Sequence, residues 1–104
     1  MAKGLGNIMK QAQQMQQKIT RLQQELEGRE IEATSGGGMV TAVVNGKQQI
    51  VSLKIEKAVV DPEDIEMLED LVTAALNEAL QQSQQMMQKE MGRLTGGMSL
   101  PGLF

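Results

Sequence analysis

Apolar residues recur at alternating intervals of three and four through the first quarter of the chain. Between Leu5 and Leu26 they occupy positions 5, 8, 12, 15, 19, 22 and 26. This spacing is the a/d seam of a heptad repeat and predicts one long helix. The glutamines between the seam positions could instead mark a low-complexity tract, but the unbroken seam favours an ordered helix. Gly28 is a natural stop, and Gly4 and Gly6 should fray the start.

The period then changes from that of a helix to that of a strand. Residues 29–35, 39–44 and 47–56 alternate between apolar and polar side chains or are rich in β-branched residues, which is typical of strands. Glycines 36–38 should reverse the chain between the first two strands. Together the three segments predict a three-stranded antiparallel meander.

The dipeptide Asn45-Gly46 joins the second and third predicted strands. It is the strongest short signal for a two-residue type I′ turn, which needs positive φ at both residues. Such a turn would place Val44 opposite Lys47 and Val40 opposite Val51. One face of the sheet would then collect six apolar side chains, Val40, Ala42, Val44, Val51, Leu53 and Ile55.

A second helix is predicted over residues 61–94. Asp61 would be its N-cap and Pro62 its first residue, with further acids in the first turn. Its first half is broadly apolar and should lie against the sheet, whereas its second half should project beyond the sheet. Residues 95–104 contain three glycines and a proline and should form a flexible tail.

The predicted order of elements is α-β-β-β-α, an α+β fold. We expect a single domain over residues 1–104: a basic heptad helix in 1–28, the meander in 29–56, the second helix in 61–94 and the tail in 95–104. The two helices are too long for one small sheet to cover, and the heptad seam needs a partner. A second copy of the chain is the simplest partner.

Composition strengthens the expectation of a dimer. The chain has no Trp or Tyr and a single Phe, at position 104. Aromatic residues normally supply much of the buried area of a small core, so an aliphatic core with nine methionines would be thin in a monomer. The absence of cysteine fits a reducing cytoplasm. No apolar run approaches the length of a membrane span and no secretory signal is recognisable, so we expect a soluble intracellular protein.

Catalytic residues are scarce in this chain. It contains no His and no Cys, which removes the usual general base, nucleophile and transition-metal ligands. The acids between Asp61 and Asp70 could hold Mg²⁺, but acids in the first turn of a helix are favoured by its dipole in any case. We therefore expect no enzymatic activity, no cofactor, no metal and no small-molecule substrate.

Charge is distributed unevenly along the chain. The net charge is −3, yet residues 1–24 carry four bases and no acid, whereas residues 61–78 carry seven acids and no base. Such asymmetry points to a polyanionic partner, although surface charges that only confer solubility would also account for it. The candidate phosphate contacts lie in the two helices and are Lys3, Lys10, Lys18, Arg21, Lys89 and Arg93.

Several segments together resemble the YbaB/EbfC family of bacterial nucleoid-associated proteins. They are LGNIMKQAQQMQ at 5–16, GMVTAVVNG at 38–46, EMLEDLV at 66–72 and GMSLPG at 97–102. The resemblance implies a tweezer-like homodimer with projecting helical arms. It also implies binding of double-stranded DNA, effects on DNA conformation and gene expression, and a place in the nucleoid. The same six bases would then hold the DNA.

The main rival is a holdase-type module that binds unfolded proteins between coiled-coil arms. The layout of long helices around a hairpin is compatible with both functions. DNA binding should weaken steeply with salt, because phosphate contacts release counterions. Client binding through apolar arms should depend on salt only weakly.

Overall fold

The structure is a computed structural model that describes residues 2–96, with side chains from residue 4 onward. Its elements are α1 (Ala2–Glu27), β1 (Glu30–Ser35), β2 (Val40–Asn45), β3 (Ile50–Ile55), a short 3₁₀ helix η1 (Lys57–Val59) and α2 (Ile65–Leu94). This is the predicted α-β-β-β-α order.

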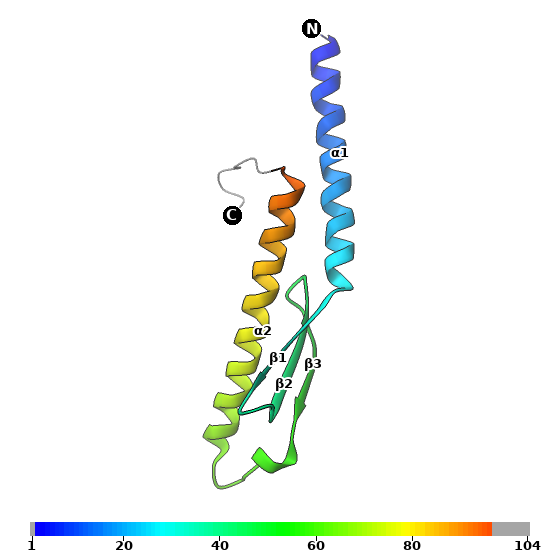
Figure 1. The fold of residues 1–104 in the computed structure, drawn as a ribbon. Coiled ribbons are helices and arrows are strands. Elements are labelled where there is room, and N and C mark those ends of the chain that lie inside the picture. The colour runs from blue at the N-terminus through cyan, green and yellow to red at the C-terminus, as the bar shows by residue number, and fades with distance from the viewer. Residues whose placement is uncertain (1, 97–104) are drawn as a thin grey trace.

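The molecule is markedly elongated. Its principal dimensions are 73 × 23 × 17 Å. The radius of gyration is 19.7 Å, whereas a compact domain of this length would have about 13 Å. The elongation comes from α1, which continues past the end of α2 (Figure 1). A protein of this shape has little interior, so most side chains remain near solvent.

Helix α1 lies within the predicted range of 1–28 and is helical through Gly4 and Gly6 up to Ala2. The predicted fraying of its first turn is therefore wrong for the backbone of the described residues. Only the last part of the heptad seam is buried. Leu22 and Leu26 are enclosed, whereas Leu5 and Ile8 are 62% and 64% exposed.

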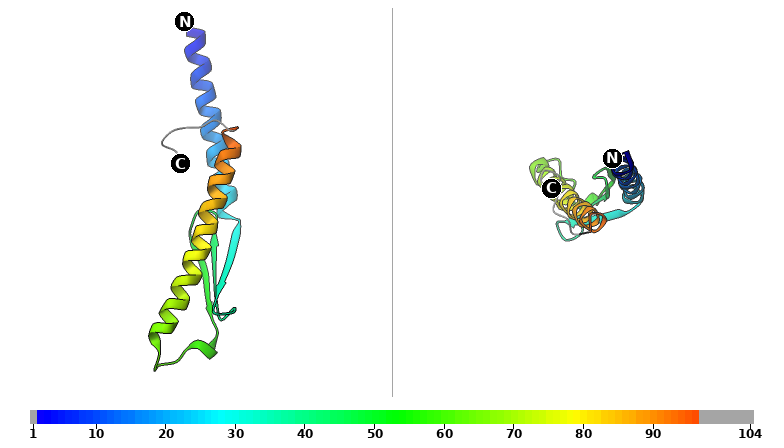
Figure 2. Two further views of the ribbon diagram at one scale, coloured as in Figure 1. Left: turned by 60° about the vertical axis from the view of Figure 1, so that its left-hand side comes forward. Right: turned by 90° about the horizontal axis from the view of Figure 1, so that it is seen from above.

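The sheet has the order β1-β2-β3 with antiparallel neighbours, as predicted. Helix α2 lies along one face of it and covers β1 and β2 (Figure 2). The contact is made by small side chains, since Ala75 and Ala79 of α2 meet Val40, Ala42 and Val44 of β2, all completely buried. Small residues on both surfaces let the helix axis approach the sheet closely.

The hairpin between β2 and β3 differs from the predicted two-residue turn. Val40 pairs with Ile55 and Ala42 with Leu53, and Val51 is an extra residue that bulges between two ladder pairs. The loop spans residues 46–49, and Gln48, not Asn45 or Gly46, has positive φ. The predicted register, with Val40 opposite Val51, is therefore wrong.

The side chain of Asn45 explains the longer loop. Its Oδ1 accepts hydrogen bonds from the backbone N–H groups of Lys47 and Gln49, both at 3.0 Å. Its amide also donates to Oε1 of Gln49 at 2.7 Å. Asparagine side chains compete in this way for backbone donors, so here Asn45 organises a wider loop in place of a tight turn.

Strand β3 is the uncovered part of the sheet. Leu53 and Ile55 lie opposite Ala42 and Val40 and so project on the face that carries α2. They are nevertheless 41% and 36% exposed, because α2 lies over the other two strands. The third strand therefore shares the apolar face of the sheet but remains uncovered within one protomer.

The start of α2 also differs from the prediction. The N-cap is Asp64, whose Oδ1 accepts the N–H of Met67 at 3.1 Å. Asp61 instead accepts the N–H of Glu63 in a preceding turn. At the other end Thr95 is the C-cap and is buried, so it is not part of a loose tail. The remainder of the predicted tail, residues 97–104, lies outside the described residues.

Candidate nucleic-acid interface

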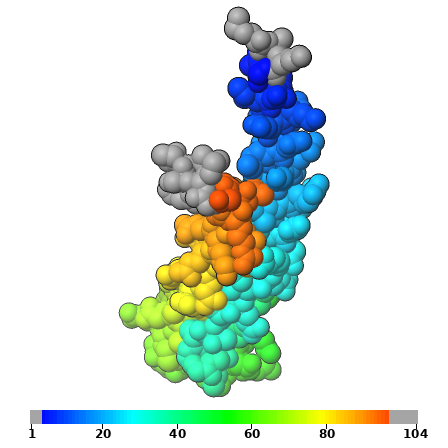
Figure 3. All heavy atoms as spheres, turned by 45° about the horizontal axis from the view of Figure 1, so that its top comes forward, coloured from blue at the N-terminus to red at the C-terminus, as the bar shows by residue number. Residues whose placement is uncertain are grey.

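The candidate interface is built on the first three quarters of α1. We call residues 2–21 the arm. Figure 3 shows its first described turns standing clear of the body, while the end of α2 lies against the lower part of α1. Lys10, Lys18 and Arg21 are all exposed on the arm. Lys3 lies in the first turns of the same helix, which contains no acid before Glu25.

The end of α2 meets the base of the arm. A shallow depression of about 200 Å³ is lined by four residues of α1, two of them basic and one acidic, and by Leu94 of α2; the α1 residues are Lys18, Arg21, Leu22 and Glu25. Leu94 follows Arg93, so the last turn of α2 lies beside Lys18 and Arg21. The other two bases of the arm are farther out: at 1.5 Å per residue, Lys10 is about 12 Å beyond Lys18 and Lys3 about 10 Å beyond Lys10.

The candidate bases differ in their neighbours. Arg93 lies 3.4 Å from Glu90, a carboxylate that Arg29 also approaches at 3.5 Å. Within residues 4–96 no ion pair involves the other members of the set, Lys10, Lys18, Arg21 and Lys89. Their charges are therefore available to an external anion, whereas that of Arg93 is shared with Glu90.

The position of the arm depends on a junction that the sequence pattern did not reveal. The N–H of Gly46, at the tip of the β2–β3 hairpin, donates to the carbonyls of Leu26 at 2.8 Å and Arg29 at 3.0 Å. The hydroxyl of Ser83, fully buried in α2, donates to the Asn45 carbonyl at 2.6 Å. The hairpin tip thus ties the end of α1 to the middle of α2.

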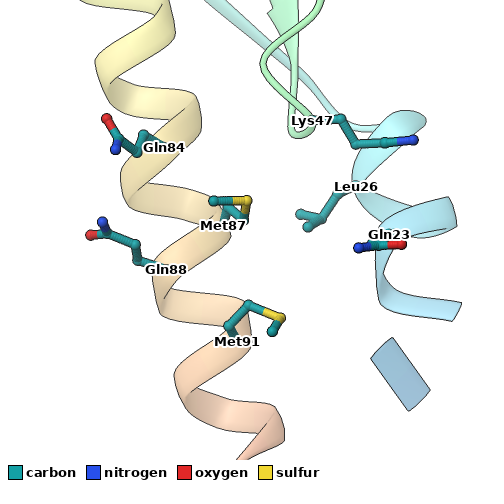
Figure 4. A pocket seen from close by; sticks show the side chains of 7 residues that line it. All are labelled: Gln23, Leu26, Lys47, Gln84, Met87, Gln88 and Met91. Atoms are coloured by element: carbon teal, nitrogen blue, oxygen red, sulfur yellow. The ribbon is translucent and has the colours of Figure 1, made fainter. Parts of the chain in front are cut away.

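A cleft of about 420 Å³ separates α1 from α2 beside this junction. Figure 4 shows Met87 and Met91 of α2 facing Leu26 and Gln23 of α1 across it, with Lys47 at the hairpin end. Both methionines are half-buried between the helices. The second half of α2 therefore packs beside α1 as well as extending past the sheet.

The acids around the start of α2 lie at the opposite end of the molecule from the arm. The turn before α2 and its first residues, which carry Asp61, Glu63, Asp64 and Glu66, are at the bottom of Figure 1, whereas the N-terminus of α1 is at the top. No three acidic side chains of the described residues converge well enough to hold a metal ion. Within residues 2–96 no helix combines the length and apolar character needed to cross a bilayer.

Comparison with known proteins identifies the family. The sequence model of the YbaB/EbfC DNA-binding family matches residues 1–98. The chain belongs to the YbaB/EbfC DNA-binding family. This family is described by DNA binding and not by a reaction.

Relatives with about half of their residues identical cover nearly the whole chain. A nucleoid-associated protein of Pelotomaculum thermopropionicum is 52% identical over 104 residues, which are 100% of this chain and 99% of the relative. Another from Alkaliphilus metalliredigens is 50% identical over 103 residues, covering 99% and 90%. A third, from Clostridium kluyveri, is 54% identical over 100 residues, covering 96% and 88%.

The fold also recurs in a solved structure. The crystal structure of the uncharacterized protein HP0035 from Helicobacter pylori superimposes with a TM-score of 0.77. It covers 88% of this chain and 94% of that one at 24% sequence identity. The YbaB/EbfC chain described here therefore shares its α-β-β-β-α architecture with a structure of low sequence identity.

Proposed function

We propose that this protein is a nucleoid-associated homodimer that binds double-stranded DNA mainly through phosphate contacts. By doing so it alters DNA conformation and contributes to nucleoid organisation and gene regulation in the cytoplasm. The observation that carries the proposal is the separation of charge along a molecule 73 Å long. An exposed arm holds bases and no acids, while the acidic stretch lies at the far end.

This separation reconciles a net charge of −3 with a polyanionic ligand. Exposed charges separated by more than about 10 Å at 0.1 M salt are largely screened from each other, so the acidic end repels DNA at the arm only weakly. Helix α1 has 26 residues and is about 39 Å long, comparable to one turn of B-DNA at about 34–36 Å. The proposed contacts are Lys3, Lys10, Lys18, Arg21, Lys89 and Arg93.

Binding of this kind has modest sequence preference. Residues 4–96 contain no aromatic side chain that could stack on bases, and phosphate contacts carry no sequence information. Asn7 and the exposed glutamines of the arm have amides that can pair with adenine in the major groove. Any preference would therefore come from these amides.

The dimer is supported by what one protomer leaves uncovered. Its enclosed apolar residues are few and mostly small. Strand β3 is an edge of the sheet and exposes Leu53 and Ile55, and Ile65 at the start of α2 is 50% exposed. An exposed apolar edge strand normally needs a cover. A second copy of the chain, pairing through the same surface, would bury these residues and double the number of arms.

The test is the fluorescence anisotropy of a labelled DNA duplex titrated with the protein at several salt concentrations. The duplex is long enough to offer about one helical turn to each arm. Each phosphate contact contributes about −0.9 to the slope of log K against log salt. The variant Lys10→Ala/Lys18→Ala should flatten this slope by up to about 2 per protomer. Lys54→Ala/Lys57→Ala removes the same charge near the far end of the sheet and should leave the slope unchanged.

Two results would contradict the proposal. Equal slopes for both double variants would show that net charge, not the arm, controls binding. No binding by the unmodified protein at low salt would leave the DNA-binding proposal without support.

A holdase-type function remains the alternative, and one observation favours it. Leu5, Ile8 and Met9 expose apolar surface on the arm, as a module that captures unfolded chains would. Suppression of aggregation of a denatured client, with little dependence on salt and with no binding to duplex DNA, would select this alternative.

A further inference from the structure

One carboxylate of α2 is shared by two arginines from different parts of the chain. Oε1 of Glu90 lies 3.5 Å from Nη1 of Arg29 and 3.4 Å from Nη1 of Arg93. Arg93 belongs to the same helix as Glu90, whereas Arg29 lies between α1 and β1. The Glu90 side chain is 17% exposed, against 51% for Arg29 and 67% for Arg93. The anion is therefore the enclosed member of this cluster, and both cations reach solvent.

The two arginines are held in different ways. The backbone of Arg29 is fixed at the junction with the hairpin tip, because its N–H donates to the Leu26 carbonyl at 3.2 Å and its carbonyl accepts the N–H of Gly46 at 3.0 Å. Arg93 lies in the last turn of α2, and its ion pair with Glu90 joins neighbouring turns of one helix. Pairs of this local kind stabilise a helix only slightly. Arg29 is therefore the fixed partner of Glu90, and Arg93 is the partner that turns away at the smaller cost.

The cluster lies at the base of the arm. Leu94, the residue after Arg93, lines the same depression as Lys18 and Arg21. A phosphate bound by these two bases would attract Arg93 as well. Carboxylates and phosphates accept the same guanidinium donors, so Glu90 and the phosphate would compete for Arg93.

Removing one partner of an enclosed ion pair is costly, because the remaining charge loses its compensation. The second arginine avoids this cost, since Glu90 keeps a cation when Arg93 leaves. We infer that Glu90 competes with DNA phosphate for Arg93, and that Arg29 is a positioning residue that keeps Glu90 paired while Arg93 binds DNA. This inference rests on the proposed function and adds to it two residues, Glu90 and Arg29, that are outside the set of proposed contacts.

Duplex affinity at one fixed salt concentration tests the competition. Glu90→Gln keeps the shape of the side chain, removes its charge and should raise the affinity about two- to fivefold, the range of one partly exposed ion pair. In an Arg93→Gln background the same change should have no effect, because the guanidinium that it releases is absent. Glu66→Gln is the control, since it removes the same charge at the opposite end of the molecule and should leave the affinity unchanged.

The role of Arg29 is tested in the same assay and by nuclear magnetic resonance. Arg29→Gln should weaken binding, because Glu90 then holds Arg93 alone, and should have no effect in the Glu90→Gln background. The chain has three arginines, so the side-chain Nε–H resonance of each can be followed in a ¹⁵N-arginine sample. Without DNA, Glu90→Gln should shift the resonances of Arg29 and Arg93 and leave that of Arg21 in place. Added duplex should move Arg21 and Arg93 more than Arg29, which stays with Glu90.

Four results would each overturn the inference while the unmodified protein still binds DNA in a salt-dependent way. The first is an unchanged affinity of the Glu90→Gln variant, and the second is a gain that persists in the Arg93→Gln background. The third is a loss from Arg29→Gln that persists when residue 90 is Gln, which would make Arg29 a direct phosphate contact. The fourth is a DNA-induced shift of Arg29 as large as that of Arg93. Absence of duplex binding by the unmodified protein would instead overturn the proposed function together with the inference.

Discussion

The contact between the hairpin tip and the end of α1 leads to a prediction for Gly46→Ala. Gly46 does not have positive φ, so its role is to allow close approach and not to form a left-handed turn. A Cβ placed on it would lie 2.8 Å from the carbonyl oxygen of Leu26, 2.9 Å from the Leu26 Cβ and 2.8 Å from Cε of Met86. The end of the Met86 side chain can move, but the Leu26 backbone can move only if α1 shifts.

The size of the effect follows from the two interactions that a shift would disturb. Overpacking of a tight site costs about 1–3 kcal/mol. Lengthening the hydrogen bonds from Gly46 N–H to the Leu26 and Arg29 carbonyls costs about 1 kcal/mol more. We therefore expect Gly46→Ala to lower the free energy of unfolding by about 2–4 kcal/mol.

Urea denaturation followed by circular dichroism measures this change, because the chain has no Trp or Tyr to report by fluorescence. With a denaturant slope of about 2 kcal/mol per molar, the midpoint should fall by about 1–2 M. All variants are compared at one protein concentration, since dimer formation would make stability concentration-dependent.

Gly92→Ala is the matched control. It adds the same methyl group within α2, where nothing lies within 4 Å of the new Cβ, and should raise stability by about 0.5–1 kcal/mol. A midpoint for Gly46→Ala equal to that of the unmodified protein would refute the close contact at the junction.

Three further changes test other parts of the structure. Ser83→Ala removes the buried hydroxyl that donates to the Asn45 carbonyl at 2.6 Å and should cost about 1–2 kcal/mol in the same denaturation assay; an unchanged midpoint would argue against this link. Gln48→Gly relieves a positive φ of 63° and should raise the free energy of unfolding by up to about 1 kcal/mol. A lower free energy of unfolding would instead favour the two-residue turn at Asn45-Gly46, in which Gln48 is part of a strand. Leu53→Asp should leave the circular dichroism spectrum folded but halve the mass measured by light scattering, because this side chain is exposed in the protomer; retention of the larger mass would place the dimer surface elsewhere.

The elements were predictable from the sequence because each has a strong local signal. Heptad spacing marks α1, alternation marks the strands, and a run of acids marks the region where α2 begins. The sequence predicted Asp61 as the N-cap of α2, whereas the N-cap is Asp64. Both aspartates precede an acidic turn, and the choice depends on which carboxylate reaches the N–H of Met67. Local chemistry alone does not separate two such similar caps.

The hairpin register was not predictable in the same way. Asn-Gly is a strong signal for a two-residue turn, but here the glycine is used to approach the Leu26 carbonyl and the asparagine side chain holds a four-residue loop. Tertiary contact therefore overrides the local preference of the dipeptide. The buried status of Ser83 was likewise invisible, because its partner is a backbone carbonyl 38 positions away.

The candidate interface shows the same division. The identity of the bases and their separation from the acids can be read from the sequence, because they are matters of composition along the chain. Their arrangement cannot: the placement of Lys18 and Arg21 beside the end of α2 depends on how the hairpin tip holds α1.

The sequence by itself determined the helices, the strands, the charge gradient and the family, since these depend on periodicity and residue type. Only the tertiary structure decided which parts of those elements are covered. One helix-on-sheet contact covers one face of β1 and β2 and leaves β3 and the arm exposed, because α2 is one helix wide and ends at Leu94. The exposed surfaces left by that geometry are where the proposed partners bind.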